Sequence, residues 1–172
     1  METNIPLDQI KLEGTYFAEC FDSEGHLKWT DKIKNLVTTV GKNLLLDTIL
    51  AGSAFTATVV MGLKGTGTAV AGDTQASHAG WLEQGLANAP TYTGNRPTPA
   101  FSAASSGSKA TSAVVAFAIT GSGTVFGCFI NINGSATKDN TTGTLFSAGD
   151  FSGGSKAVVN GDTINVSYSL AA

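Results

Sequence analysis

The sequence contains few charged residues. Asp, Glu, Lys and Arg make up only 13% of its 172 residues, about half of the roughly 25% that is usual in soluble proteins. A disordered chain combines low hydrophobicity with high net charge, so this composition argues against intrinsic disorder. Solubility must therefore rest on Ser, Thr, Asn and Gly. A surface of this composition is more typical of an all-β protein than of a metabolic enzyme.

Basic clusters and long hydrophobic runs are also missing. The net charge is −3, and the Lys and Arg residues are scattered along the chain, whereas nucleic-acid binding needs a concentrated basic patch. The longest apolar run, "NLLLDTILAG", is too short to cross a bilayer. The first residues, "METNIPLDQI", lack the basic and apolar regions of a signal peptide. We therefore expect no nucleic-acid partner, no membrane partner, and synthesis in the cytoplasm.

Only two cysteines are present, Cys20 and Cys128, and both have apolar neighbours. Two thiols are too few for the disulfide framework of a small secreted protein, and the Cys and His residues lack zinc-binding spacing. We expect both cysteines to be buried as small apolar side chains, with a single disulfide as the alternative. The sequence predicts no metal and no other cofactor.

Most of the chain has the pattern of β-strands, and its length fits one domain over 1–172. Residues 9–29 predict a hairpin around a turn at 22–25. Apolar and polar side chains alternate strictly over 163–170, as in a strand with one buried face. Gly, Pro and Asn make 85–99 an irregular loop that leads to an edge strand. Further strands are predicted over 55–65, 108–120, 125–133, 144–151 and 156–159.

One segment changes to the period of an α-helix, at about 39–51. Thr38 or Thr39 is expected to cap its N-terminus, and Gly52 is expected to end it. Many short strands, Gly and Asn turns and one helix predict a mainly β, single-domain fold, either an antiparallel β-sandwich or a jelly-roll-like arrangement. The apolar residues at i, i+4 spacings are Val40, Leu44, Leu45, Ile49 and Leu50.

The stretch "AGDTQASHAGWLE" places the residue types of a nucleophilic triad close together, in Asp73, Ser77 and His78. Adjacent residues such as Ser77 and His78 usually point apart, and no G-x-S-x-G motif supplies a remote nucleophile. A structural interpretation explains more of the stretch. Asp73 would cap a single helical turn, Gly80 would end it in the left-handed conformation, and Trp81 would be buried.

The other titratable residues carry weak signals. His26 falls in a predicted turn, where we expect a solvated side chain. Asp139, Asp150 and Asp162 each lie beside Gly or Asn, where a short acidic side chain bonds its own backbone. A calcium site among these three is the alternative, although they lack the alternate-position spacing of a calcium loop.

The order of the segments is more informative than any single motif. The N-terminal "YFAECFDSEGHLKW" is followed by "NLVTTVGKNLLLDTIL", "VVMGLKG", "AGDTQASHAGWLE", "RPTPAFSAA", "AVVAFAI", "TVFGCFI", "GTLFSAGDF" and "VVNGDTINVSYSL". From about Tyr16 to Leu170, these segments together resemble a family of small structural proteins of tailed bacteriophages. In some phages the members are head decoration (cement) proteins.

The resemblance implies a β-rich, non-enzymatic protein that binds the outer surface of the phage capsid as a homo-oligomer. The expected partner is the major capsid protein, and the expected location is the capsid surface of the virion. Residues 1–9 are then a candidate arm that docks on a neighbour, because Ile5, Pro6 and Leu7 lie outside any predicted core element. A terminus without a binding role is the alternative. Trp81 and Tyr92 are further candidates for interaction.

Two other functions stay open. A tail or head-fibre module could bind a host receptor, in particular a glycan, with exposed aromatic side chains such as Trp81 or Tyr92 stacking on the sugar rings. A hydrolase that uses His78 is the other alternative, and it would need a nucleophile from elsewhere in the fold.

Overall fold

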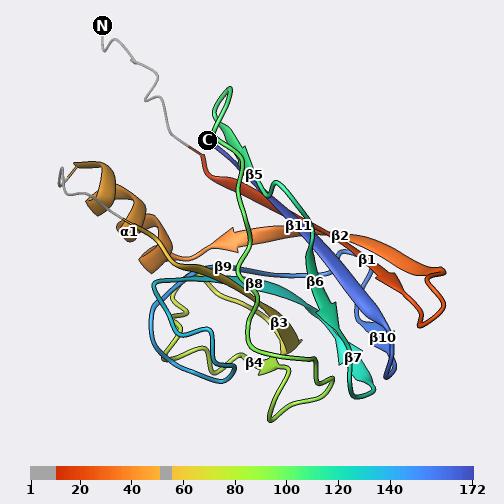
Figure 1. The fold of residues 1–172 in the computed structure, drawn as a ribbon. Coiled ribbons are helices and arrows are strands. Elements are labelled where there is room, and N and C mark those ends of the chain that lie inside the picture. The colour runs from red at the N-terminus through yellow and green to blue at the C-terminus, as the bar shows by residue number, and fades with distance from the viewer. Residues whose placement is uncertain (1–10, 51–55) are drawn as a thin grey trace, which may run out of the picture.

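The computed structural model describes residues 11–50 and 56–172. Within these ranges the chain forms eleven β-strands and one α-helix (Figure 1), and no helix there has the length and apolarity that crossing a membrane requires. The strands are β1 (Glu13–Phe21), β2 (Leu27–Val37), β3 (Val59–Gly67), β4 (Trp81–Gln84), β5 (Ser108–Ala110), β6 (Val115–Ala118), β7 (Gly123–Val125), β8 (Gly127–Ile132), β9 (Thr144–Asp150), β10 (Lys156–Val158) and β11 (Thr163–Ala171), and the helix is α1 (Thr39–Leu50).

Nine of these strands join one antiparallel sheet. Its order is β4-β3-β8-β9-β2-β1-β11-β5, with β6 also paired to β11, while β7 and β10 form a separate two-stranded sheet. Strand β2 connects the two halves, because residues 27–35 pair with β1 whereas Leu36 and Val37 pair with β9. The predicted hairpin is the β1–β2 pair. The predicted mainly β fold with one helix is therefore confirmed.

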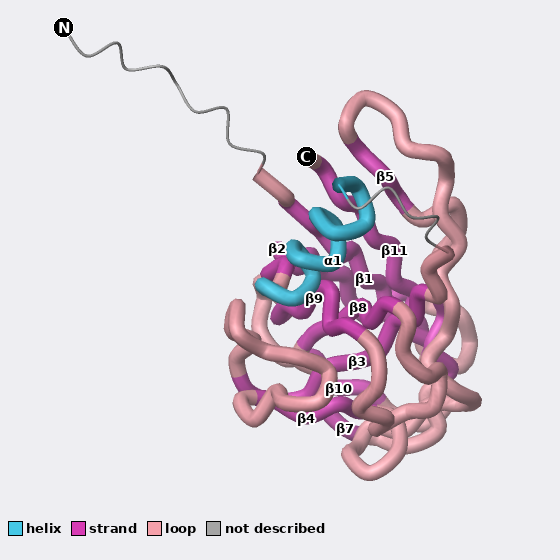
Figure 2. Tube along the Cα trace, turned by 90° about the vertical axis from the view of Figure 1, so that its left-hand side faces the viewer, coloured by secondary structure: helices cyan, strands magenta, loops and turns pink. Residues whose placement is uncertain are grey.

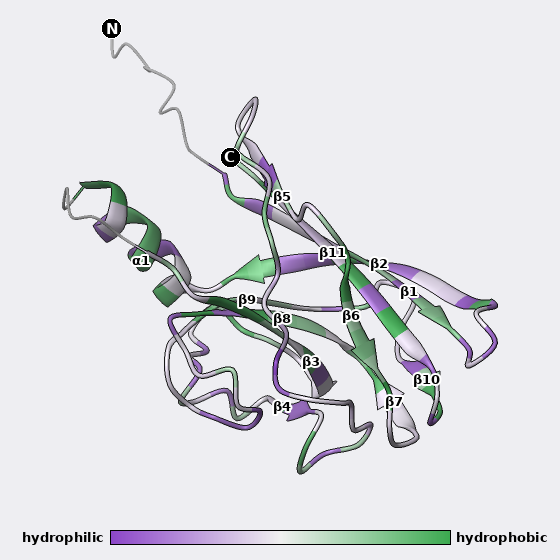
Figure 3. Cartoon of the chain, viewed as in Figure 1, coloured by the Kyte–Doolittle hydropathy of each residue, from purple (hydrophilic) through white to green (hydrophobic). Residues whose placement is uncertain are grey.

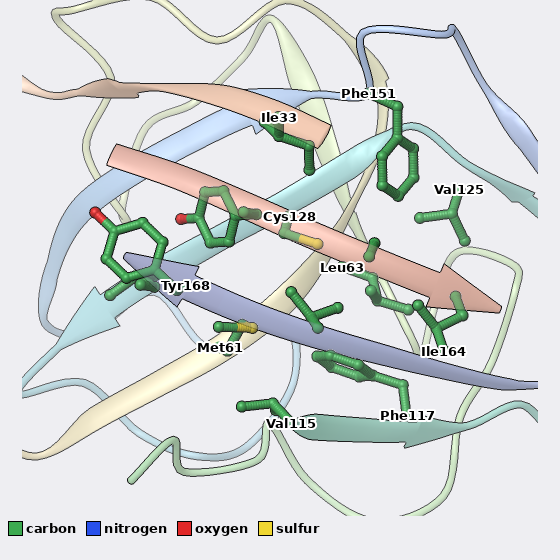
Figure 4. Packing of buried hydrophobic residues seen from close by; sticks show 14 of the residues in the cluster. Ile33, Met61, Leu63, Val115, Phe117, Val125, Cys128, Phe151, Ile164 and Tyr168 are labelled. Carbon is green, nitrogen blue, oxygen red and sulfur yellow. The ribbon is translucent and has the colours of Figure 1, made fainter. Parts of the chain in front are cut away.

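The two halves of the sheet face each other across the main core (Figure 4). Tyr16 of β1 and Phe117 of β6 enter the core from one half, and Met61 of β3 and Cys128 of β8 enter it from the other. This two-layer packing is that of the predicted sandwich. Strand β11 has the alternation predicted for it, since residues 164, 166 and 168 are buried and the residues between them are half-buried.

A smaller cluster lies on the other face of the β3–β8–β9 half. Trp81, Phe129, Leu145 and Ala148 pack together there. The loops before and after β4 and the loop between β8 and β9 lie beside these strands (Figure 1). The loop predicted over 85–99 is one of them. These loops therefore belong to the packed body of the protein.

Helix α1 matches the segment predicted to be helical. Thr38 caps it, because its Oγ1 accepts a hydrogen bond from the backbone N–H of Gly41 at 3.1 Å, whereas Gly52 lies outside the described residues. Gly41 is its only residue classed as buried. The helix contacts the sheet at β9, and most of its length projects from the body (Figure 1).

Candidate functional site

A groove runs between α1 and the ends of β1, β5 and β11. It has a volume of about 810 Å³, and α1 stands beside β5 and the C-terminus in Figure 2. Leu45, Leu46 and Ile49 of α1 line one side, while Leu12 and Leu170 line the side formed by the strand ends. We call this feature the α1 groove.

The apolar side chains on α1 are unusually exposed. Leu46 is 54% exposed, Ile49 66% and Leu50 80%, and Figure 3 shows hydrophobic residues along the projecting part of the helix. Soluble proteins rarely leave adjacent large apolar side chains in water unless the patch binds something. The sequence pattern predicts the helix, but not that the described fold leaves this side of it uncovered.

The charged side chains that line the α1 groove within the described ranges are all basic. Lys11, Lys42 and Lys109 line it, and no Asp or Glu does. Lys11 forms an ion pair with the nearby Glu13, and Lys109 donates a hydrogen bond to the carbonyl of Ser102 at 3.0 Å. The groove therefore suits an apolar partner that also carries negative charge.

The predicted contact residues Ile5, Pro6 and Leu7, with the rest of the candidate arm 1–9, lie outside the described residues. The first described residue, Lys11, lines the α1 groove. The candidate arm therefore joins the folded chain at the groove.

The expectation that Trp81 and Tyr92 are exposed aromatic platforms is wrong. Trp81 is 2% exposed and Tyr92 is 3% exposed. Trp81 packs on Phe129 in the smaller cluster, and Tyr92 makes an edge contact with Phe117 while Lys138 Nζ lies 4.2 Å from its ring centroid. The Trp81 ring, from the start of β4, is buried in the smaller cluster, and the Tyr92 ring is buried in the main core, so neither offers a face to a sugar.

Asp73, Ser77 and His78 do not form a catalytic set. The His78 ring stacks on Trp81 with 4.0 Å between the ring centroids, and His78 Nδ1 lies 3.1 Å from the Trp81 carbonyl oxygen. Asp73 Oδ2 accepts a hydrogen bond from the Trp81 indole at 3.0 Å. Both polar side chains thus hold Trp81, as the structural interpretation of this stretch requires, and His78 gains a role that the sequence left open.

The predicted helical turn at Asp73 is nevertheless wrong. Residues 71–80 form turns, bends and irregular backbone, and Gly80 does not have a positive φ. Asp73 Oδ2 accepts a bond from the backbone N–H of Val70 at 2.9 Å, whereas a helix cap bonds to residues that follow it. The carboxylate is directed toward Trp81 and the preceding chain, which leaves no cap for a helix here.

The three turn carboxylates lie in separate contacts. Asp162 pairs with Lys28 at 2.5 Å, Asp150 pairs with the fully buried Lys64, and Asp139 accepts a hydrogen bond from a backbone N–H of another loop. Across residues 11–50 and 56–172, no group of three or more His, Cys, Asp and Glu side chains is arranged to hold a metal ion. The geometry gives the calcium alternative no support.

The cysteines and His26 have the structural roles expected of them. Cys20 and Cys128 are buried and unpaired, so the disulfide alternative is wrong. Burial, with a smaller contribution from the Asp162 carboxylate, raises the pKa of the Cys20 thiol to about 12, and burial raises the pKa of the Cys128 thiol above its usual value. The His26 side chain is exposed in its turn.

Sequence reasoning missed a buried ion pair between Glu83 and Arg96. Arg96 is 2% exposed and Glu83 is 4% exposed, and Arg96 Nε donates to Glu83 Oε1 at 2.7 Å. Arg96 also donates to the carbonyls of Ser135 and Asn140. One side chain therefore joins β4 to the loop after β8, and a lone Arg in a Pro-rich loop carries no sequence signal of this.

A small polar pocket of about 190 Å³ lies beside this ion pair. Gln75, His78, Asp139 and Asn140 are among its lining residues. Gln75 is buried, and its Oε1 has no hydrogen-bond partner within the described part of the chain. A buried acceptor without a partner is costly, so this pocket suits a water molecule or a small hydroxyl-bearing ligand.

Comparisons with protein-family models, with curated proteins and with solved structures found no match to this chain. The resemblance to phage structural proteins stays a prediction from the order of segments.

Proposed function

We propose that this chain is a non-enzymatic structural protein of a tailed-phage particle, and that it decorates the outside of the head as a homo-oligomer. The observation that carries the proposal is the apolar side of α1, with Leu46 and Ile49 exposed beside an apolar groove. An interaction surface of this kind is what a protein that works by binding other subunits needs. The order of the sequence segments supports the phage assignment.

A physical argument supports the cementing role. A capsid expands late in maturation and is then pressurised by packaged DNA. A protein that contacts neighbouring major capsid subunits only in the mature lattice stabilises that state by mass action. Symmetry repeats the contact many times, so individually weak sites act together.

The described side chains also support a binding role rather than catalysis. His78 stacks on Trp81, Asp73 accepts from the Trp81 indole, and Glu83 is neutralised by Arg96. These three side chains are thus held in contacts that maintain the scaffold.

A binding experiment on phage heads tests the proposal. Purified protein is added to expanded heads that lack it and to unexpanded procapsids, and bound protein is measured after sedimentation. We expect binding to expanded heads only, with density at defined positions of an icosahedral reconstruction. Leu46→Asn should weaken binding. Leu27→Asn is the matched control, because both leucines are 54% exposed. It should not weaken binding, because Leu27 lies on β2 and is not part of the groove. Recovery of the protein only with tails would contradict the head assignment.

A receptor-binding module is the second candidate. Trp81 and Tyr92 are buried and cannot stack on sugar rings for it. The small polar pocket, with the unpartnered Gln75 Oε1, supports this candidate. A sugar hydroxyl could donate to that oxygen. Folded protein on a glycan array should then give a signal that Gln75→Leu removes, and an array without any signal counts against this candidate.

A further inference from the structure

The α1 groove and the segment that precedes it have complementary chemistry. The groove is apolar, and its charged lining residues are lysines. Residues 1–10, "METNIPLDQI", combine aliphatic side chains with the carboxylates of Glu2 and Asp8, and they contain no Lys or Arg. Opposite charge around an apolar contact favours specific docking.

The segment is also long enough to occupy the groove. An extended chain spans roughly 3.3–3.6 Å per residue, so nine residues reach about 30 Å. A helix rises about 1.5 Å per residue, so Lys42 and Ile49 lie about 10 Å apart along α1. The segment can therefore cover the groove with several residues to spare.

The groove of a neighbouring copy is a better fit than the chain's own groove. Lys11 and Leu12 already line the groove of their own chain. Residues 9–12 contain no Gly, Pro, Asn or Asp, which are the residues that favour tight turns, so the sequence carries no turn signal that would fold the segment back onto the same molecule. Pro6 and the residue before it favour extended backbone, which suits an arm that reaches another molecule.

We propose that residues 1–10 of each copy dock in the α1 groove of a second copy, so that the protein assembles by exchange of arms. The aliphatic side chains of the arm cover the exposed apolar side of α1, and Glu2 and Asp8 face Lys42 and Lys109. Every copy gives one arm and receives one, which allows the assembly to close as a pair or a ring. The inference deepens the homo-oligomer of the proposed function, but it does not depend on a capsid.

Disulfide cross-linking of the purified full chain tests this arrangement. Chains with Leu7→Cys and chains with Leu46→Cys are mixed, allowed to exchange and oxidised, and the native Cys20 and Cys128 give little background because both are buried. We expect a cross-linked dimer, because only an arm in a neighbour's groove brings these two thiols together. The matched control mixes Leu7→Cys with Leu27→Cys chains, and it should give no dimer.

A chain that carries both Leu7→Cys and Leu46→Cys distinguishes the two ways of filling the groove. If this chain forms a bond within itself while the mixture gives no dimer, the arm lies in its own groove and the proposal is overturned. The absence of any bond in both experiments overturns it as well, since the groove would then have another occupant.

Charge reversal gives a second measurement, by sedimentation of the isolated protein. Glu2→Lys with Asp8→Lys should weaken self-association about tenfold or more, and adding Lys42→Glu with Lys109→Glu should restore it. If these substitutions leave the association constant unchanged, docking of the acidic arm is contradicted. If the copies cross-link but the protein does not bind phage heads, the proposed function is contradicted and the exchange of arms is supported. If the protein binds phage heads but no cross-link forms, only the exchange of arms is contradicted.

Discussion

The indole of Trp81 donates a hydrogen bond to the Asp73 carboxylate, with 3.0 Å between Nε1 and Oδ2. Both residues are buried, and the His78 ring stacks on the Trp81 ring with 4.0 Å between the ring centroids. Asp73 and His78, which belong to the residue types of a catalytic triad, thus hold the Trp81 side chain in place. Their polar groups position the loop before β4 against the sheet.

Replacing Asp73 should therefore lower stability. Asp73→Ala leaves the buried indole N–H and the Val70 backbone N–H without their acceptor, and an unsatisfied buried donor costs about 1–3 kcal/mol. We expect a loss of this size in the free energy of unfolding, measured by urea denaturation. Ser77→Ala, at an exposed position of the same loop, should stay within about 0.5 kcal/mol of the wild type. Equal effects of the two substitutions on the free energy of unfolding would contradict this role of Asp73.

Breaking the buried ion pair should cost more. Glu83→Gln leaves the Arg96 guanidinium buried beside a neutral partner, and removing one member of a buried pair typically costs about 3–5 kcal/mol. Urea denaturation should show a loss of this order, while Glu24→Gln in the exposed β1–β2 turn should have almost no effect. The double variant Glu83→Leu, Arg96→Met should recover part of the loss, because it removes both charges. A fully stable Glu83→Gln protein would show that the pair is not needed.

Asp31 should make stability depend on pH in the acid range. Burial alone raises the pKa of this carboxyl, but the hydrogen bonds from Lys156, Ser152 and nearby backbone N–H groups outweigh it and hold the pKa below its usual value. The folded state therefore binds this proton less tightly than the unfolded state does. The resulting stability is fully present above the unfolded pKa of about 3.9 and is lost as the pH falls through the lower folded pKa.

Urea midpoints measured from about pH 6 down to about pH 2 check this effect. Asp31→Asn should lower the midpoint at neutral pH and flatten its decline in acid. Asp47→Asn, at an exposed position of α1, is the control and should leave the profile unchanged. An Asp31→Asn profile that runs parallel to that of the wild type would contradict the assignment.

The elements that the sequence predicts well are those determined by local pattern. The alternation over 163–170 places β11 in the core because successive side chains of a strand face opposite sides. The helix predicted over about 39–51 does begin beside Thr38, because a hydroxyl that accepts a hydrogen bond from the first turn needs only neighbouring residues. Turn residues at 22–25 likewise identify the β1–β2 hairpin.

The features that the sequence did not predict depend on contacts between distant segments. Tyr92 lies in loop-like sequence, and its ring is buried in the main core although no local pattern indicates this. Glu83 and Arg96 are separated by 13 positions, and no periodicity links them. The exposed side of α1 is a different case. Its apolar pattern indicates burial, but no segment of the described chain covers it. On our proposal, the arm of a second copy does so.

Gly41 provides a test of how α1 is seated. It lies where the helix meets β9, and a Cβ added there would be 2.5 Å from the backbone oxygen of Phe146. Helix propensity alone favours Ala over Gly by about 1 kcal/mol, so Gly41→Ala would stabilise a helix that was free of contacts. Here the clash is with backbone and cannot be relieved by a rotamer change, so we expect the clash to dominate and the urea midpoint to fall. Asn43→Ala, at an exposed position of the same helix, feels only the propensity and should be neutral or slightly stabilising. If both substitutions stabilised the protein, α1 would not be fixed to β9, and the groove that depends on its position would not be a preformed site.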